Sequence, residues 1–175
     1  MNAKKERIYQ DTSYTIDAVK LELDNGMLCE FPLINHPGGV VILAMNEYRQ
    51  IALVKQNRFA IGEETLELPA GKLDNKPNET PLDGAKRELR EEVGVLANDW
   101  TFLGHVYPSP GILNEKLWLY FAKDIVLSKQ DLDFDEILTA EWMSLSSFRS
   151  LLLTGKITDA KTLCAYALAK EKNFL

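Results

Sequence analysis

The chain has 175 residues, of which 46% are hydrophobic and 26% are charged, so it has the length and composition of one soluble globular domain rather than of a disordered chain. Lys and Arg number 20 against 26 Asp and Glu, which gives a formal net charge of −6 and argues against a basic nucleic-acid-binding surface. An acidic chain that acts on a phosphate compound needs a cation between the two negative partners.

The N-terminal 35 residues alternate apolar and polar side chains around Asn25-Gly26, a pair that suits a hairpin turn. Residues 1–35 are therefore predicted to form a strand region, and residues 36–175 to form the main domain. The pattern further predicts strands that together form one mixed sheet, at residues 40–45, 51–56, 101–107, 117–122 and 137–143.

Two helices are predicted from their start and stop signals. Thr80 supplies a hydroxyl N-cap, Pro81 suits the first turn, and Gly94 supplies a left-handed stop after Val93. The second helix is predicted to begin near Asp159 and to run to about residue 172. Its candidate core positions are Leu163, Tyr166, Ala167 and Leu168.

The cysteines and the N-terminus bear on the compartment. Cys29 and Cys164 are far apart and have no metal-ligand spacing, so neither a disulfide framework nor a structural zinc site is expected. Residues 1–7 lack the apolar core of a signal peptide, and the apolar run at 40–45 is too short to cross a membrane. A cytoplasmic protein without a membrane partner is predicted.

Three glutamates on the first helix are the candidate chemical group. Glu88, Glu91 and Glu92 are spaced i, i+3, i+4, so their carboxylates fall within one stripe of the helix. One interpretation is a solvated acidic face, since Lys86, Arg87 and Arg90 lie nearby. The other is a site for Mg²⁺ or Mn²⁺, hard cations that prefer carboxylate oxygens and relieve the repulsion between them.

The residues around these glutamates favour the second interpretation. Gly71, Glu79 and the run Arg87-Glu88-Leu89-Arg90-Glu91-Glu92-Val93-Gly94-Val95 resemble the signature of the Nudix hydrolase family. Every specified position matches from Glu79 to Val95. The chain departs from the signature once, because seven residues separate Gly71 from Glu79 where the family usually has five. A loop absorbs such an insertion without changing the helix register.

The resemblance extends from about residue 36 to about residue 162. Residues 54–58, 66–71 and 107–111 are similar to segments of the ADP-ribose pyrophosphatase branch of the family, and Pro110 follows Val95 at the 15-residue offset associated with that branch. The resemblance implies an α/β/α sandwich with a mixed sheet, and a homodimer that exchanges the N-terminal strand region. It also implies Mg²⁺-dependent hydrolysis of nucleoside diphosphate sugars, with ADP-ribose giving AMP and ribose 5-phosphate.

Other functions remain open at this stage. A GDP-mannose or broad nucleotide-sugar hydrolase is one alternative, because base and sugar contacts lie outside the signature. A non-catalytic ADP-ribose-binding module is another, although such a module has little reason to keep the glutamate cluster. A cap or polynucleotide hydrolase predicts a basic stripe, and no Lys/Arg cluster of that kind is visible in the sequence.

The resemblance also implies residue roles. Glu88 and Glu92 are expected metal ligands, Glu91 is expected to be a ligand or to hold a water on the metal, and the backbone carbonyl of Ala70 is expected to complete the set. Glu91 and Glu92 are thereby assigned to catalysis as well. Supporting roles around the ligands fall to Gly71, Glu79 and Arg87, of which the last two are expected to form an ion pair.

The group that accepts the proton from water is predicted on a downstream acidic stretch. Glu136 is the first candidate there, followed by Asp133 and Asp135, and a solvated loop without a role is an equal alternative. Glu115 is a further candidate for positioning metal or water, against the alternative of a strand-edge charge paired with Lys116.

Substrate contacts are predicted from residue chemistry and from the resemblance. Arg58 is the candidate diphosphate clamp, because a guanidinium donates two parallel hydrogen bonds to phosphate oxygens. Glu67 is a candidate for sugar or base, with a strand-edge carboxylate as an equal alternative, and Pro110 marks the substrate-specific segment. Aromatic candidates for stacking on a base are Tyr14, Phe59 and Tyr107. The two histidines, His36 and His105, are expected to be structural.

Overall fold

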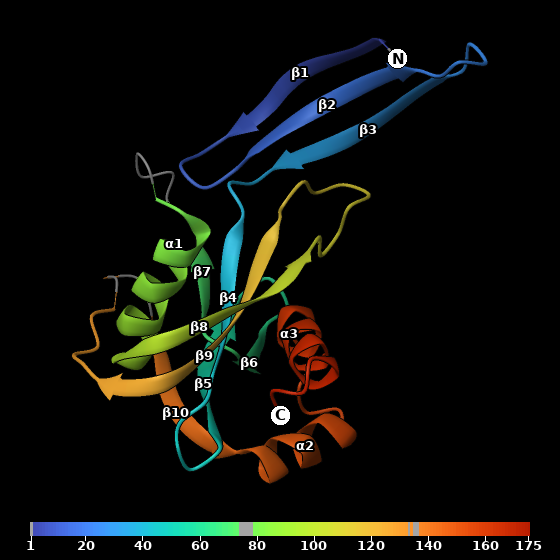
Figure 1. The fold of residues 1–175 in the computed structure, drawn as a ribbon. Helices are drawn as coiled ribbons and strands as arrows, with labels where there is room; N and C mark the ends of the chain where they lie inside the picture. Colours follow the sequence, from blue (N-terminus) through green and yellow to red (C-terminus); the bar gives the residue numbers. More distant parts are fainter. Residues whose placement is uncertain (1, 74–78, 133, 135–136) are drawn as a thin grey trace.

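The structure is a computed structural model that describes residues 2–73, 79–132, 134 and 137–175 (Figure 1). Their strands form three sheets. In spatial order these are β1 (Asn2–Gln10), β2 (Thr15–Glu22) and β3 (Leu28–Asn35); β7 (Ala70–Lys72), β4 (Gly39–Ala44), β9 (Leu117–Leu127) and β8 (Val95–Val106); and β10 (Leu138–Ser144), β5 (Gln50–Arg58) and β6 (Glu63–Glu67). The helical segments are α1 (Pro81–Glu88), η1 (Leu89–Val93), α2 (Leu145–Leu153) and α3 (Ala160–Glu171).

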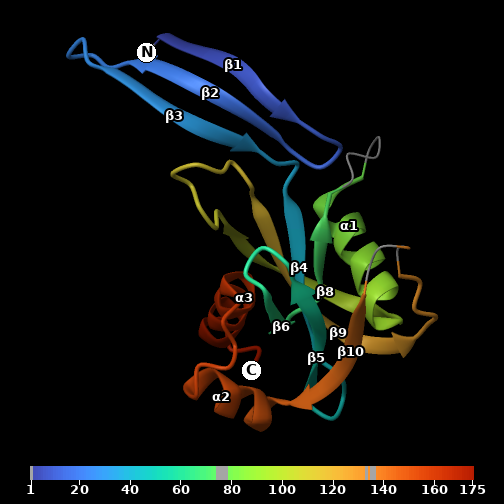
Figure 2. The ribbon, with the colours of Figure 1, turned by 180° about the vertical axis from the view of Figure 1, so that it is seen from behind.

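The central sheet is mixed, because β4 runs parallel to β9 while the other pairs are antiparallel. All of β4 is buried, and its side chains alternate between two apolar clusters. Val41 and Leu43 point into the cluster beside α3, whereas Val40 and Ile42 point into the cluster beside α1. Figures 1 and 2 show these helices on opposite sides of β4. The predicted α/β/α class is confirmed, although the strands divide among several sheets rather than forming one.

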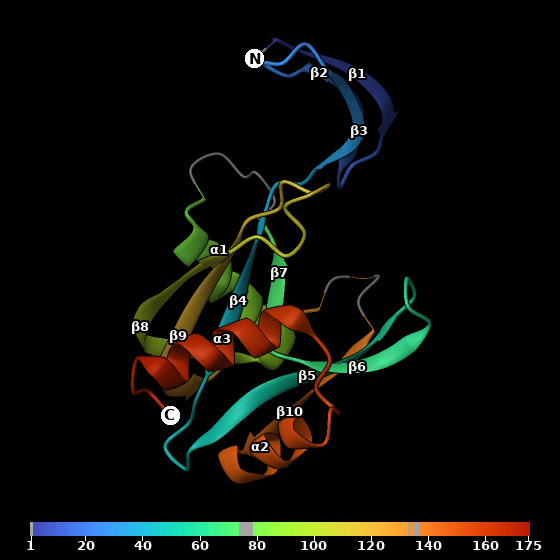
Figure 3. The same cartoon turned by 90° about the vertical axis from the view of Figure 1, so that its right-hand side faces the viewer.

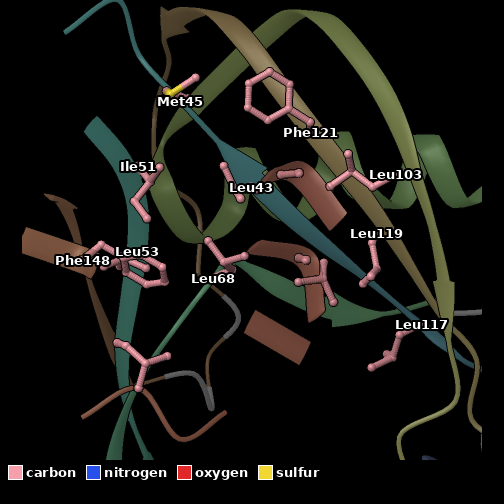
Figure 4. Close-up of a cluster of buried hydrophobic side chains, with 14 residues drawn as sticks. Leu43, Met45, Ile51, Leu53, Leu68, Leu103, Leu117, Leu119, Phe121 and Phe148 are labelled. Carbon is pink, nitrogen blue, oxygen red and sulfur yellow. The ribbon is translucent and has the colours of Figure 1, made fainter. Parts of the chain in front are cut away.

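The larger apolar cluster joins both sheets of the main body. Figure 4 shows Leu43 of β4, Leu53 of β5, Leu119 of β9 and Phe148 of α2 converging on one interior. Burying a side chain of this size contributes about 1.5–3 kcal/mol to folding. This cluster therefore fixes the two sheets relative to each other and, with them, the elements that carry the site.

The helix before Gly94 begins and ends where the sequence predicts. Thr80 and Asp83 form a capping box, in which the Thr80 hydroxyl accepts a hydrogen bond from the Asp83 N–H at 3.2 Å. Gly94 ends the helix with a φ of 73°, in the left-handed region. The last five residues, η1, are wound as a π-helix, which periodicity did not indicate. Such wider turns occur frequently at functional sites.

The N-terminal sheet lies apart from the main body in Figures 1 and 3. The predicted hairpin is present between β2 and β3, with Gly26 at a φ of 80°. A third strand, β1, was not expected as a separate element, because the sequence pattern predicted only one strand pair here and most residues of β1 are polar. The sheet meets the body through a hydrogen bond of 2.7 Å from the Ile34 N–H to the Ile112 carbonyl.

Of the C-terminal helices, α3 packs against β4, β8 and β9, and α2 packs against β10 (Figure 3). Asp159 caps α3, accepting a hydrogen bond from the Thr162 N–H at 2.9 Å, and α3 keeps the predicted bounds within one residue. The α2 helix was not predicted; its N-cap is Ser144. In the part of the chain that the structure describes, no helix has the length and apolar character needed to span a membrane.

Candidate active site

A cavity of about 520 Å³ opens beside the carboxyl half of the first helix. Its walls come from β4, β5, β7, α1, η1, the segment before β9 and the start of α3. Charged side chains of both signs line it: Glu88, Glu92, Glu115 and Asp159, with Arg58, Lys72, Arg87 and Lys161. A cavity with acidic and basic walls can accept a cation and an anion together.

Two of the three predicted glutamates face this cavity from the helix. Glu92 is 2% exposed, and its Oε2 accepts a hydrogen bond of 2.9 Å from the Ala70 N–H. Glu88 is 5% exposed, and its carboxylate fills the space that a Cβ on Gly71 would occupy. Strand β7 thus holds both carboxylates against the cavity wall. Glycine is needed at position 71 because the Glu88 carboxylate lies directly against the backbone there.

Arg87 is the charge that holds this cluster together. Its Nη1 donates hydrogen bonds to Glu88 at 2.7 Å and to Glu91 at 2.9 Å, and its Nε donates to Glu79 at 3.0 Å. Burial alone would lower the pKa of Arg87, but the charge of Glu88 and these hydrogen bonds raise it. The guanidinium therefore stays protonated, and its Nη2 also ties the helix to the Lys72 carbonyl at 3.0 Å.

The donor set suits a hard divalent cation. Glu88, Glu92 and Ala70 line the same cavity and offer carboxylate and carbonyl oxygens, the ligands that Mg²⁺ and Mn²⁺ prefer. Within the described ranges, no three His, Cys, Asp or Glu side chains converge as a complete ligand group. Glu91 points instead to Arg87 and to Nη2 of Arg90, 3.3 Å away. Its role at the metal stays a prediction.

A charge network centred on the buried Glu67 carboxylate holds Arg58 and Lys161, which also line the cavity. Arg58 donates to Glu67 through Nε at 2.7 Å and Nη2 at 2.5 Å, and Lys161 and Thr65 also donate to the Glu67 carboxylate. Burial would raise the pKa of Glu67, but Arg58 and Lys161 outweigh it and lower this pKa to about 2. Asp159 accepts a hydrogen bond from Lys161 at 2.8 Å. Arg58 is thus presented to the cavity in one orientation.

The structure brings His36 to the site, which the sequence did not indicate. Its Nδ1 lies 3.2 Å from Glu115 Oε1, and both residues line the cavity. Burial lowers the pKa of His36 more than the Glu115 charge raises it. The expected alternative partner of Glu115, Lys116, lies over the Trp118 ring instead, 5.0 Å from its centroid. Residues 79 positions apart meet here because Gly39 of β4 pairs with Leu117 of β9.

The remaining predicted residues lie elsewhere. Pro110 is exposed, and Pro108 rather than Pro110 lines the cavity. Phe59 is 92% exposed, and Tyr14 packs on Tyr9 with ring centroids 5.7 Å apart. Candidate proton acceptors outside the described residues are Glu136, Asp133 and Asp135. Lys161 and Asp159 also belong to the site and were missed, because the sequence offers only a helix start there.

Replacing Gly71 by Ala is expected to reduce turnover by about 10²-fold, since the new Cβ would displace the Glu88 carboxylate. The measurement is kcat and KM, with urea unfolding as a check on folding. Gly62→Ala is not a clean control because its φ is positive, whereas Gly111→Ala adds a Cβ in open space without that strain. Equal activity in Gly71→Ala and the wild type would contradict the role of this contact.

The comparisons with known proteins agree with the geometry. The NUDIX domain profile matches residues 35–166. The ADP-ribose pyrophosphatase of Bacillus subtilis is 33% identical over 94% of this chain and 88% of its own, and a methanol dehydrogenase activator of Bacillus methanolicus is 32% identical over 93% and 88%. A crystal structure of an ADP compounds hydrolase superposes with a TM-score of 0.83 at 25% identity, covering 98% of this chain and 91% of that one. The chain therefore belongs to the NUDIX domain family, as its sequence pattern predicts.

Proposed function

We propose that the protein is a Mg²⁺-dependent hydrolase that cleaves the pyrophosphate of nucleoside diphosphate sugars, with ADP-ribose giving AMP and ribose 5-phosphate. The observation that carries the proposal is the two-sided cavity, in which Glu88 and Glu92 lie on one wall and Arg58 and Lys161 on another. The likeness to a named ADP-ribose pyrophosphatase over 94% of the chain supports this substrate class.

Glu88, Glu92 and the Ala70 carbonyl would hold the divalent cation. A bound cation of this kind supplies positive charge against the diphosphate and acidifies the attacking water. The chain itself keeps both carboxylates in place, through the Ala70 N–H at 2.9 Å and the Arg87 Nη1 at 2.7 Å. Mn²⁺ shares the preference for oxygen ligands and is the expected substitute.

Arg58 is the proposed phosphate clamp. Its side chain is 40% exposed and lines the cavity, while Glu67 fixes the guanidinium from behind. Both Glu67 oxygens accept hydrogen bonds from neighbouring side chains. We therefore assign Glu67 to positioning Arg58 rather than to a contact with sugar or base.

Glu115 is the described acid best placed to take a proton from water. It lines the same cavity as the helix glutamates, and its Oε1 lies 3.2 Å from the Nδ1 of His36. Glu136 remains the proposal from the sequence, with Asp133 and Asp135 behind it. The variants Glu115→Gln and Glu136→Gln distinguish the two candidates. The pH dependence of kcat is measured in each, and the increase of kcat with rising pH is expected to disappear only in the variant that lacks the base.

The N-terminal residues 1–35 are proposed as an extension that takes part in a homodimer. Exposed apolar side chains on the strands and turns of this region support the proposal: Ile8, Tyr9, Tyr14, Met27 and Leu28. Static light scattering of the full chain is expected to give twice the chain mass, and a single-chain mass at micromolar concentration counts against the dimer.

Cys29 and Cys164 are free thiols, which suits a cytoplasmic location.

Product analysis across a substrate panel tests the proposal. ADP-ribose, GDP-mannose, UDP-glucose, a dinucleoside polyphosphate and a capped RNA are incubated with the protein and Mg²⁺. The highest kcat/KM is expected for ADP-ribose, with no release from the RNA, because the charge of −6 disfavours a polynucleotide. No monophosphate from any nucleotide sugar would refute the proposed function, and preference for GDP-mannose would correct its substrate.

A further inference from the structure

The carboxyl end of the first helix is covered by the segment that follows β9, residues 128–131. Figures 1 and 2 show the chain after β9 beside this end of the helix. Three of its donors meet carbonyls that a helix end leaves without intrahelical partners. The Ser128 N–H donates to Gly94 at 2.8 Å, the Asp131 N–H donates to Glu91 at 3.1 Å, and the side-chain Nε2 of Gln130 donates to the Glu92 carbonyl at 2.6 Å.

Gly94 makes this approach possible. A Cβ at position 94 would lie 2.9 Å from the Gln130 backbone nitrogen, closer than real Cβ atoms come, and 3.2 Å from the Gln130 Cβ, tighter than most real contacts. The φ of 73° at Gly94 turns the chain away at the same point. The helix end and the segment 128–131 are thus packed backbone against backbone, with Gln130 contributing the side-chain hydrogen bond.

Glu92 is held at both of its ends. Its backbone carbonyl accepts from Gln130, and its carboxylate, 2% exposed, accepts from the Ala70 N–H across the cavity wall. The residue lies in the π-wound turn η1, where the backbone is wider than in an α-helix. A shift of the backbone at Glu92 therefore carries the carboxylate away from Ala70.

We propose that Gln130 is a positioning residue of the site: it fixes the backbone of Glu92 and thereby aims the Glu92 carboxylate at Ala70 and the cavity. The role in turnover rests on the proposed function, but the positioning itself concerns only this chain.

Three variants test the proposal in the full chain. Gln130→Met keeps the length of the side chain and removes the N–H donor, whereas Gln130→Lys keeps a donor of similar reach. Lys129→Ala is the matched control, because Lys129 is the exposed neighbour on the same segment. The readouts are the Ala70 amide resonance in the metal-free protein, Mg²⁺ affinity by calorimetry, and kcat and KM for ADP-ribose.

Gln130→Met is expected to move the Ala70 amide resonance, to weaken Mg²⁺ binding by about tenfold and to lower kcat by about tenfold with KM within about twofold. Gln130→Lys is expected to restore most of each value, and Lys129→Ala to change none. An Ala70 resonance and Mg²⁺ affinity in Gln130→Met that equal those of the control would overturn the proposal. Equal losses in the Met and Lys variants would overturn it too, since the donor would then be irrelevant. An inactive wild type would reject the proposed function alone, because the resonance and calorimetry still decide the positioning.

Discussion

Glu92→Gln is expected to lower kcat for ADP-ribose by at least about 10³-fold, a loss of about 4 kcal/mol in transition-state stabilisation. The substitution removes a charge and keeps the shape. The Gln oxygen can still accept the Ala70 N–H, which Glu92 Oε2 accepts at 2.9 Å in the wild type. The missing charge is one that the proposed cation site needs, so the loss is expected to fall on turnover and on Mg²⁺ affinity rather than on folding.

The measurement is steady-state kinetics with saturating Mg²⁺, together with the urea midpoint of unfolding. Glu171→Gln is the matched control, because it makes the same chemical change at an exposed position on α3. A Glu92→Gln enzyme that keeps more than about a tenth of wild-type kcat would contradict a metal-ligand role, since ligand loss costs far more. A urea midpoint so low that much of the variant is unfolded under the assay conditions would instead assign Glu92 to stability.

Glu67→Gln is expected to lower the free energy of unfolding by about 3 kcal/mol at pH 7, because it leaves Arg58 and Lys161 without their shared counter-charge. The pKa of Glu67, ordinarily 4.5, is lowered to about 2 in the folded chain, mainly by Arg58 and Lys161 against the opposing effect of burial. A carboxylate with a lowered pKa stabilises the fold above its unfolded pKa and loses that contribution as the pH falls through the folded value.

The difference between Glu67→Gln and the wild type is therefore expected to be complete above about pH 5 and to shrink as the pH falls toward 2. Urea unfolding at pH 7, 5 and 3 measures it. Glu63→Gln, an exposed change on the same strand, is the control. A loss at pH 3 as large as at pH 7 would show that packing rather than charge is responsible.

The helix that carries the site could be predicted from sequence because its signals are local. Thr80, Pro81 and Gly94 act within one turn of the backbone, and the structure keeps the start and the end that they indicate. The π-wound turn could not be predicted, because apolar periodicity does not distinguish it from an α-helix, and the donors of residues 128–131 that meet its carbonyls come from a distant segment. Glutamate spacing alone also did not reveal that Glu91 points to arginines while Glu88 and Glu92 face the cavity.

Contacts between distant segments account for most of what the sequence missed. His36 meets Glu115, and Lys161 meets Glu67, only because the strands and α3 bring them together. On α3 the buried positions are Thr162, Ala165 and Ala169, whereas Leu163 is 38% exposed. Small side chains let this helix approach the sheet closely. Of the predicted core positions, Tyr166 and Leu168 are partly buried and pack against the larger apolar cluster, whereas Leu163 and Ala167 are exposed.

The most direct test of the proposed chemistry is the release of AMP from ADP-ribose by the wild-type protein with and without divalent cation. With Mg²⁺, AMP and ribose 5-phosphate are expected in equal amounts; EDTA is expected to stop the release, and added Mg²⁺ to restore it. Hydrolysis that continues unchanged in EDTA, or a product other than these two phosphates, would contradict the assignment of Glu88 and Glu92 to a metal-dependent pyrophosphatase site.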